Sequence, residues 1–245
     1  MKRVLLALAL IGVAFGGANA QPTDLSGGVF IAHFVPEIMN SEPPEGWCGQ
    51  YDVLYKINDH SEQNSRIDTA TYMWSAWYVL SGFCEDKQFC GAQFGVGQYG
   101  GEWAFDSGST QACWPPVATP SGLELPSAGW PGAGEGTALT STSGPWDGNY
   151  LAVYLMTGYA YGYGAMGIVP LDVNGQTGSG GWTNCEGVPV EFTPAAYGGM
   201  GINMDGTYAE PECGGPPVWA CCFADGSCLM LTAVACADAA GAWYD

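Results

Sequence analysis

Carboxylates are the most abundant side chains in this sequence that commonly perform catalysis. The chain holds 24 aspartates and glutamates but only two histidines, His33 in an apolar run and His60 in a polar stretch. No G-x-S-x-G, H-E-x-x-H or P-loop motif occurs, and no G-x-G opens a predicted helix. We therefore predict no serine hydrolase, metalloprotease or dinucleotide-binding enzyme.

Glycoside hydrolysis is the enzyme class that the composition leaves open, because it needs only two carboxylates. The candidate pairs are Glu102 with Asp106, and Glu124 with Glu135. With so many acids present, such pairs also arise without a catalytic role. We therefore predict a protein that is not an enzyme, with its acids as solvated surface groups, and keep a glycosidase as the alternative.

One short segment bears on metal binding. Asp172, Asn174 and Gly175 follow the start of a calcium loop, but the later acidic positions and the final glutamate are missing. The large excess of acids also suits neutralisation by divalent cations. Calcium binding is left open, and no other cofactor is predicted.

Tryptophans in loop-like surroundings are the main candidates for ligand binding. Trp103, Trp114, Trp130 and Trp146 lie in or beside stretches rich in glycine and proline. Their flat rings could stack on sugars or anchor a protein partner. The alternative is that they close the ends of a β-sandwich, since tryptophan is usually largely buried.

Ten cysteines predict a disulfide framework rather than a zinc site, because their spacing does not match zinc motifs. We predict that Cys84 and Cys90 staple a hairpin tip. The predicted longer bridges are Cys48–Cys113 and Cys185–Cys213, with Cys221 and Cys222 bonding outward to Cys228 and Cys236.

The first twenty residues match an export signal. Lys2 and Arg3 precede an apolar run that ends in the small residues of Ala18-Asn19-Ala20, so we expect cleavage after Ala20. The remaining chain would keep three basic residues against 24 acids. That balance argues against nucleic acid and anionic membranes as partners. The remaining chain is also predicted to have no membrane span. We expect a secreted or cell-surface protein whose partner is an extracellular protein or a glycan, with self-assembly also open.

Composition favours strands over helices. Glycine is frequent, aromatic residues reach 13%, and charged residues only 12%. We predict a mainly β fold, an antiparallel β-sandwich of jelly-roll or immunoglobulin-like type. The predicted strands cover residues 29–34, 51–57, 71–80, 88–99, 150–156, 188–192 and 197–204, with an edge strand at 136–142 inside a mostly loop-like region, 100–148. The predicted domains are a signal peptide at 1–20, the sandwich at 21–209, a linker at 210–218 and a cysteine-rich module at 219–245, with a short helix at 232–240.

The segment from Ala220 to Trp243 follows the pattern A-C-C-x2-D-G-x-C-x7-C-x4-G-x-W. It resembles a small cysteine-rich module found at the ends of secreted proteins of environmental bacteria. The stretches GVFIAHFVPE and GWPGAGEGTALT in the body resemble uncharacterised secreted β proteins of such bacteria. Neither resemblance implies an activity or a catalytic residue. We expect a non-catalytic protein with a binding or extracellular structural role, and the alternative is a carbohydrate-active protein.

Overall fold

The fold is a β-sandwich followed by a small separate unit. The computed structural model describes residues 24–36, 48, 51, 56–71, 74–106, 108–173, 176–185, 191–213, 218–223, 228–232 and 242–244. The chain divides into two compact units, residues 1–211 and 212–245. Among the described residues, no helix is long and apolar enough to cross a membrane.

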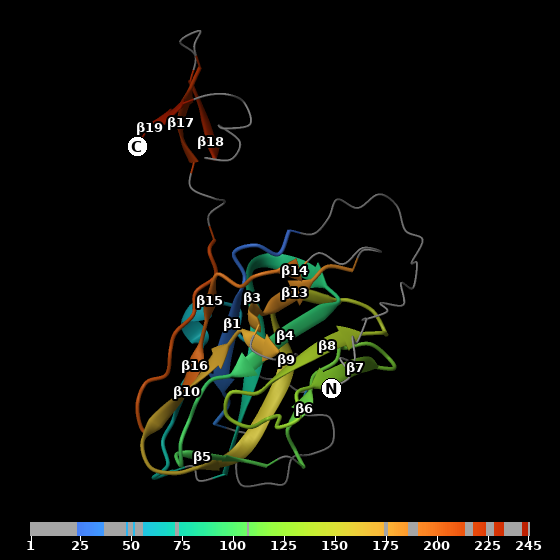
Figure 1. The fold of residues 1–245 in the computed structure, drawn as a ribbon, viewed down its shortest axis with the longest axis vertical. Helices are drawn as coiled ribbons and strands as arrows, with labels where there is room; N and C mark the ends of the chain where they lie inside the picture. Colours follow the sequence, from blue (N-terminus) through green and yellow to red (C-terminus); the bar gives the residue numbers. More distant parts are fainter. Residues whose placement is uncertain are drawn as a thin grey trace, which may run out of the picture. The chain divides into compact units, whose positions relative to one another are not determined.

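Two sheets form the first unit (Figure 1). The first sheet has the order β15 (Ala196–Tyr197), β1 (Val29–Phe34), β3 (Trp74–Phe89), β9 (Trp146–Ala160) and β5 (Trp103–Phe105), with β6 (Gln111–Ala112) also paired to β9. The second has the order β14 (Glu191–Phe192), β13 (Gly181–Thr183), β4 (Gly91–Val96), β10 (Gly164–Val169), β16 (Gly199–Ile202) and β2 (Arg66–Ile67), with β8 (Gly136–Ser141) paired to β4 and β7 (Gly122–Pro126) paired to β8. A hairpin of β11 (Leu171–Val173) and β12 (Gln176–Ser179) and one 3₁₀ turn, η2 (His60–Glu62), complete the unit. The predicted mainly β sandwich is confirmed, although the β1–β15 and β16–β2 pairs are parallel.

The long strands β3 and β9 are apolar on both faces because both faces are covered. Trp77 and Val79 point into the core between the sheets. Tyr78 and Leu80 alternate with them and belong to a second buried cluster on the outer side of the first sheet, which includes Tyr51. A strand with two buried faces carries a continuous apolar run, which is the pattern that the sequence shows here.

Several predicted strand boundaries are corrected. The region 100–148, expected to be mostly loop, contains β5 to β8, and β8 lies inside the second sheet rather than at its edge because it pairs with both β4 and β7. No strand includes Tyr51, Lys56 or Ile57, and the rest of the strand predicted for 51–57 lies outside the described residues.

The predicted disulfides are partly confirmed. Cys48–Cys113 forms, and it ties Cys48 to the outer cluster, which contains Cys113. Cys90, however, bonds Cys185, so both Cys84–Cys90 and Cys185–Cys213 are wrong. No turn separates Cys84 from Cys90, because Cys84 lies within strand β3 and Cys90 directly follows it. An extended backbone holds Cα atoms six positions apart beyond the roughly 7 Å limit for a disulfide.

The second unit contains the three-stranded sheet β18-β17-β19, with β17 (Val218–Cys222) between β18 (Cys228–Thr232) and β19 (Ala242–Tyr244). Cys221 and Cys222 are both disulfide-bonded. Thr232, the predicted start of a helix, is the last residue of β18, and the remainder of that helix lies outside the described residues.

Candidate functional site

Two of the four candidate tryptophans belong to the core. Trp103 and Trp146 are only 3% and 1% exposed. Trp146 stacks on Phe89, and its indole nitrogen donates to the Cys113 carbonyl at 3.1 Å. Neither ring presents a face to solvent. Trp114 and Trp130 are half-buried and pack against the core.

Trp130 belongs to a polar network that crosses between the sheets. Its indole nitrogen donates to the Tyr154 hydroxyl at 2.7 Å, and that hydroxyl donates to the Glu124 carboxylate at 2.8 Å. Thr137 donates to the same carboxylate oxygen at 2.9 Å. Burial raises the pKa of Tyr154 well above its usual range, and the negative charge of Glu124 adds to this effect. Every polar atom in this chain of contacts has a partner, so the network is a structural link.

The remaining candidate catalytic groups are also engaged in structure. The Glu135 carboxylate lies against Gly129, whereas its proposed partner Glu124 contacts Tyr154. His33 is buried and accepts a hydrogen bond from the Asn64 amide through Nδ1. His60 lies between two carboxylates, with Nε2 3.3 Å from Glu210. Among the described residues, no group of three or more His, Cys, Asp and Glu side chains could hold a metal ion. In the calcium-like segment, Asp172 lies in β11, and residues 174 and 175 lie outside the described range.

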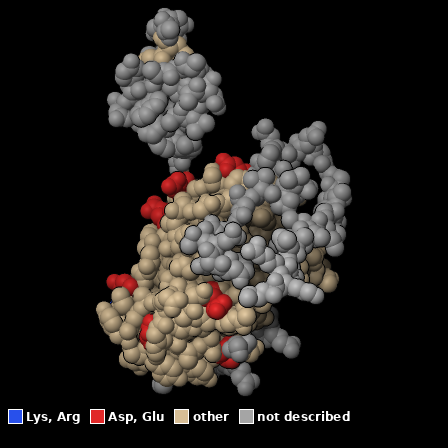
Figure 2. Space-filling model, in the orientation of Figure 1, with Lys and Arg blue, Asp and Glu red and all other residues tan. Residues whose placement is uncertain are grey.

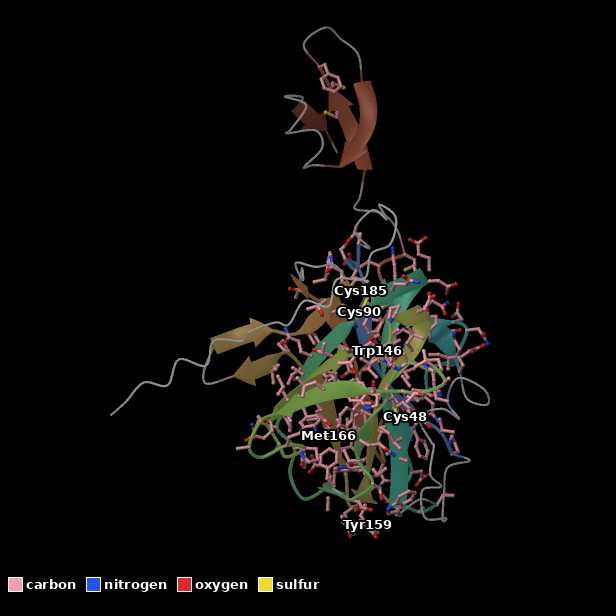
Figure 3. All side chains as sticks on the ribbon, turned by 90° about the vertical axis from the view of Figure 1, so that its right-hand side faces the viewer. Cys48, Cys90, Trp146, Tyr159, Met166 and Cys185 are labelled. Carbon is pink, nitrogen blue, oxygen red and sulfur yellow. A yellow bond between two sulfur atoms is a disulfide. The ribbon has the colours of Figure 1, made fainter. Side chains whose placement is uncertain are left out.

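Exposed aromatic rings gather instead where β9 ends. Tyr159 and Tyr161 are each 43% exposed, and Tyr163 is 72% exposed. The rings of Tyr159 and Tyr161 are nearly parallel, with an interplanar angle of 19° and centroids 6.5 Å apart. Tyr159 lies at one end of the sandwich, far from the Cys90–Cys185 disulfide at the other (Figure 3).

The short strand β5 fixes the side of the sheet on which these rings lie. Trp103 and Phe105 pack on the core. Ala104, between them, pairs directly with Tyr159, so both side chains point to the outer face. Gly158 permits this arrangement, because a Cβ atom there would come within 2.5 Å of the Ala104 carbonyl oxygen and 2.7 Å of the Trp103 ring.

The turn after β9 is held from two sides. The Tyr161 amide donates to the Glu102 carbonyl at 2.6 Å, which continues the β5–β9 ladder by one pair. The Asn203 side chain donates to the Gly162 carbonyl and to the Thr69 hydroxyl. Gly162 has φ +64°, a conformation that favours glycine.

Acidic residues flank Ala104 in the chain, but only Asp106 follows the outer face. The Glu102 carboxylate lies against Gly164 of β10, in the second sheet. The Asp106 amide donates to the Thr157 carbonyl, so Glu102 and Asp106 lie opposite Tyr161 and Thr157 in the extended ladder. The Glu102 carboxylate accepts from the Gly100 amide, and the Asp106 carboxylate accepts from Gly108 and Ser109. Each carboxylate therefore turns away from the other.

This divergence bears on the glycosidase alternative. Residues four apart along a strand have Cα atoms about 13 Å apart. A glycosidase needs carboxyl groups roughly 5–5.5 Å apart for retention, or about 6.5–9.5 Å apart for inversion. Glu102 and Asp106, whose carboxylates also turn apart, do not match either spacing.

We call Tyr159, Tyr161, Ala104 and Asp106 the tyrosine site. It combines two exposed rings, a small residue beside them and one carboxylate on one face of a rigid sheet. Sequence reasoning placed binding on the tryptophans and missed this site. The available signal was the alternation Y-A-Y-G-Y-G at 159–164, in which each large amphipathic ring is followed by a residue too small to cover it.

Comparison with known proteins finds no matching family model, no matching curated protein and no matching solved structure.

Proposed function

We propose that this chain is a secreted or cell-surface protein that binds an extracellular partner without catalysis, and that the tyrosine site is its contact surface. The observation that carries the proposal is the pair of parallel rings, Tyr159 and Tyr161, exposed on a sheet whose other aromatic residues are largely buried. Tyrosine is enriched at interfaces because one end of the side chain is apolar and the other hydrogen-bonds with water or a partner.

Three properties of the chain support export. Residues 1–20 have the form of a signal peptide. The two disulfides Cys48–Cys113 and Cys90–Cys185 are typical of oxidising compartments. The resemblance of residues 220–243 to a module of secreted bacterial proteins agrees with the same location.

The rigid placement of the tyrosine site supports binding. Its backbone is fixed by the β5–β9 ladder and by Asn203, so little conformational freedom is lost when a partner docks. A sugar-binding module is the second candidate, because flat exposed rings can also stack on sugars.

The test uses the secreted protein on two arrays, one of oligosaccharides and one of peptides from extracellular proteins. We expect the wild type to bind members of one array, and a Tyr159→Ala/Tyr161→Ala variant to lose most of that signal. The control is Tyr208→Ala, because Tyr208 is 48% exposed but packs beside His60, away from the site. A signal that the double variant retains would refute the tyrosine site as the contact surface.

A further inference from the structure

Resting on the proposed function, we infer that the tyrosine site binds a cationic protein segment that presents arginine or lysine side chains. The inference joins the charge of the chain, the position of the Asp106 carboxylate and the geometry of the two rings.

The charge of the molecule attracts cations. The full chain has a formal net charge of −19. Of the basic residues outside the export signal, Arg66 pairs with Asp205 at 3.1 Å and Lys87 with Glu85 at 2.7 Å. Among the described residues, the face drawn in Figure 2 displays carboxylates at several places and no lysine or arginine. Such a field steers basic partners towards the protein and repels polyanions.

The Asp106 carboxylate of the site lies where a bound cation could use it. Asp106 lies opposite Thr157 in the extended ladder, on the same outer face as Ala104 and Tyr159. It is partly exposed. A segment lying along β5 could therefore place one basic side chain against this carboxylate and another against the rings.

The two rings can share one cation. A cation interacts with an aromatic ring when it lies over the ring face, within about 6 Å of the centroid. The rings of Tyr159 and Tyr161 are nearly parallel and their centroids are 6.5 Å apart, so a cation between the two rings lies within this limit of both. Arginine suits the position best, since its planar guanidinium also stacks on aromatic faces.

Other ligand classes use only part of this site. A metal ion would need several converging oxygen ligands, and the site offers the carboxylate of Asp106, which already accepts from Gly108 and Ser109. A neutral sugar would use the rings but would gain nothing from the net charge. A basic segment uses both the rings and the charge, and its binding should therefore weaken with salt.

The test is a titration of the full secreted protein, followed by calorimetry, with a nine-residue peptide of alternating glycine and arginine. The matched control peptide carries citrulline in place of arginine, which keeps the shape and removes the charge. A neutral glucose hexamer serves as the sugar probe. We expect the arginine peptide to bind, the citrulline peptide to bind at least tenfold more weakly, and affinity for the arginine peptide to fall as salt is raised.

Variants then locate the binding. We expect Tyr159→Leu/Tyr161→Leu to weaken binding by about five- to thirtyfold, from two exposed cation–π contacts. We expect Asp106→Asn, which keeps an acceptor oxygen, to weaken it by about two- to fivefold. The controls Tyr208→Leu and Glu85→Gln should bind as the wild type does, since neither residue belongs to the site.

The failures are distinguishable. Two results would overturn the cationic partner but leave the tyrosine site as a contact surface. One is equal binding of the arginine and citrulline peptides. The other is binding of the glucose hexamer alone, when the Tyr159→Leu/Tyr161→Leu variant loses that binding. Arginine-peptide binding that the tyrosine variant retains, or that the Glu85 control loses equally, would overturn both.

Discussion

Replacing Tyr154 by phenylalanine should destabilise the sandwich through a defined pair of hydrogen bonds. The substitution removes only the hydroxyl, so the ring keeps its contacts with Phe94 and Trp130. It deletes the bond from the Trp130 indole and the bond to the Glu124 carboxylate. The first is a neutral hydrogen bond worth about 1 kcal/mol and the second, to a charged group, about 1.5–3 kcal/mol.

The loss should be partly offset in the variant. Glu124 keeps its bond from Thr137, and both Glu124 and Trp130 retain some solvent access. We therefore expect the free energy of unfolding of the oxidised protein to fall by about 2–3 kcal/mol. Chemical denaturation, followed by the change in tryptophan fluorescence, measures it. The matched control is Tyr159→Phe, whose hydroxyl lies on an exposed residue and should matter by less than about 0.5 kcal/mol. A loss of 0.5 kcal/mol or less for Tyr154→Phe would refute the network as a link between the sheets.

Three further outcomes follow from the structure. The pKa of Tyr154 is raised by burial, so the folded state holds this proton more tightly than the unfolded state does. Stability from this residue is fully present below about pH 10, the ordinary tyrosine value, and is lost as the pH rises further, so alkaline denaturation of Tyr154→Phe should be less steep than that of the wild type. Peptide mapping without reduction should recover Cys48 with Cys113 and Cys90 with Cys185, and a peptide joining Cys84 to Cys90 would contradict the fold. The Cys90–Cys185 bridge spans 95 residues, so removing it should lower the free energy of unfolding by up to about 4–5 kcal/mol. Mass spectrometry of the exported protein should find Gln21 at its N-terminus, and an intact Met1 on the secreted product would contradict the signal peptide.

Sequence patterns predicted the strands that have strong apolar runs. The segments that became β1, β3 and β9 are apolar on both faces, and the structure buries both of their faces. The strands at 103–105, 111–112 and 122–126 were missed because each is only two to five residues long and lies among glycines and prolines. Their strand geometry comes from pairing with β9 or β8 rather than from local preference.

The disulfide pairing depends on contacts between strands that are far apart in the sequence. Cys84 and Cys90 are close in sequence, but β3 continues past Leu80 to Phe89, so the turn that would join them does not form. Cys185 meets Cys90 because β13 pairs with β4 in the second sheet, with Thr183 opposite Gly91. This long-range register depends on the whole sheet and is not encoded near either cysteine.

The candidate site was only partly predictable for a similar reason. Glu102 and Asp106 were identified as a possible pair of carboxylates, but the sequence alone did not indicate that their side chains diverge. Tryptophan is the strongest interface residue on average. Here, however, Trp103, Trp114, Trp130 and Trp146 fill the core or its margin, and the exposed rings of the site are tyrosines beside alanine and glycine. Exposure depends on which face of β9 each ring takes, which is set by the pairing with β5.

The most direct test of the tyrosine site is hydroxyl-radical footprinting of the secreted protein with and without the arginine peptide, read by mass spectrometry. Bound peptide should protect Tyr159 and Tyr161 and leave Tyr208, which is similarly exposed, unchanged. Protection of Tyr208 to the same extent, or no protection of Tyr159 and Tyr161 at peptide concentrations that saturate binding, would contradict the account.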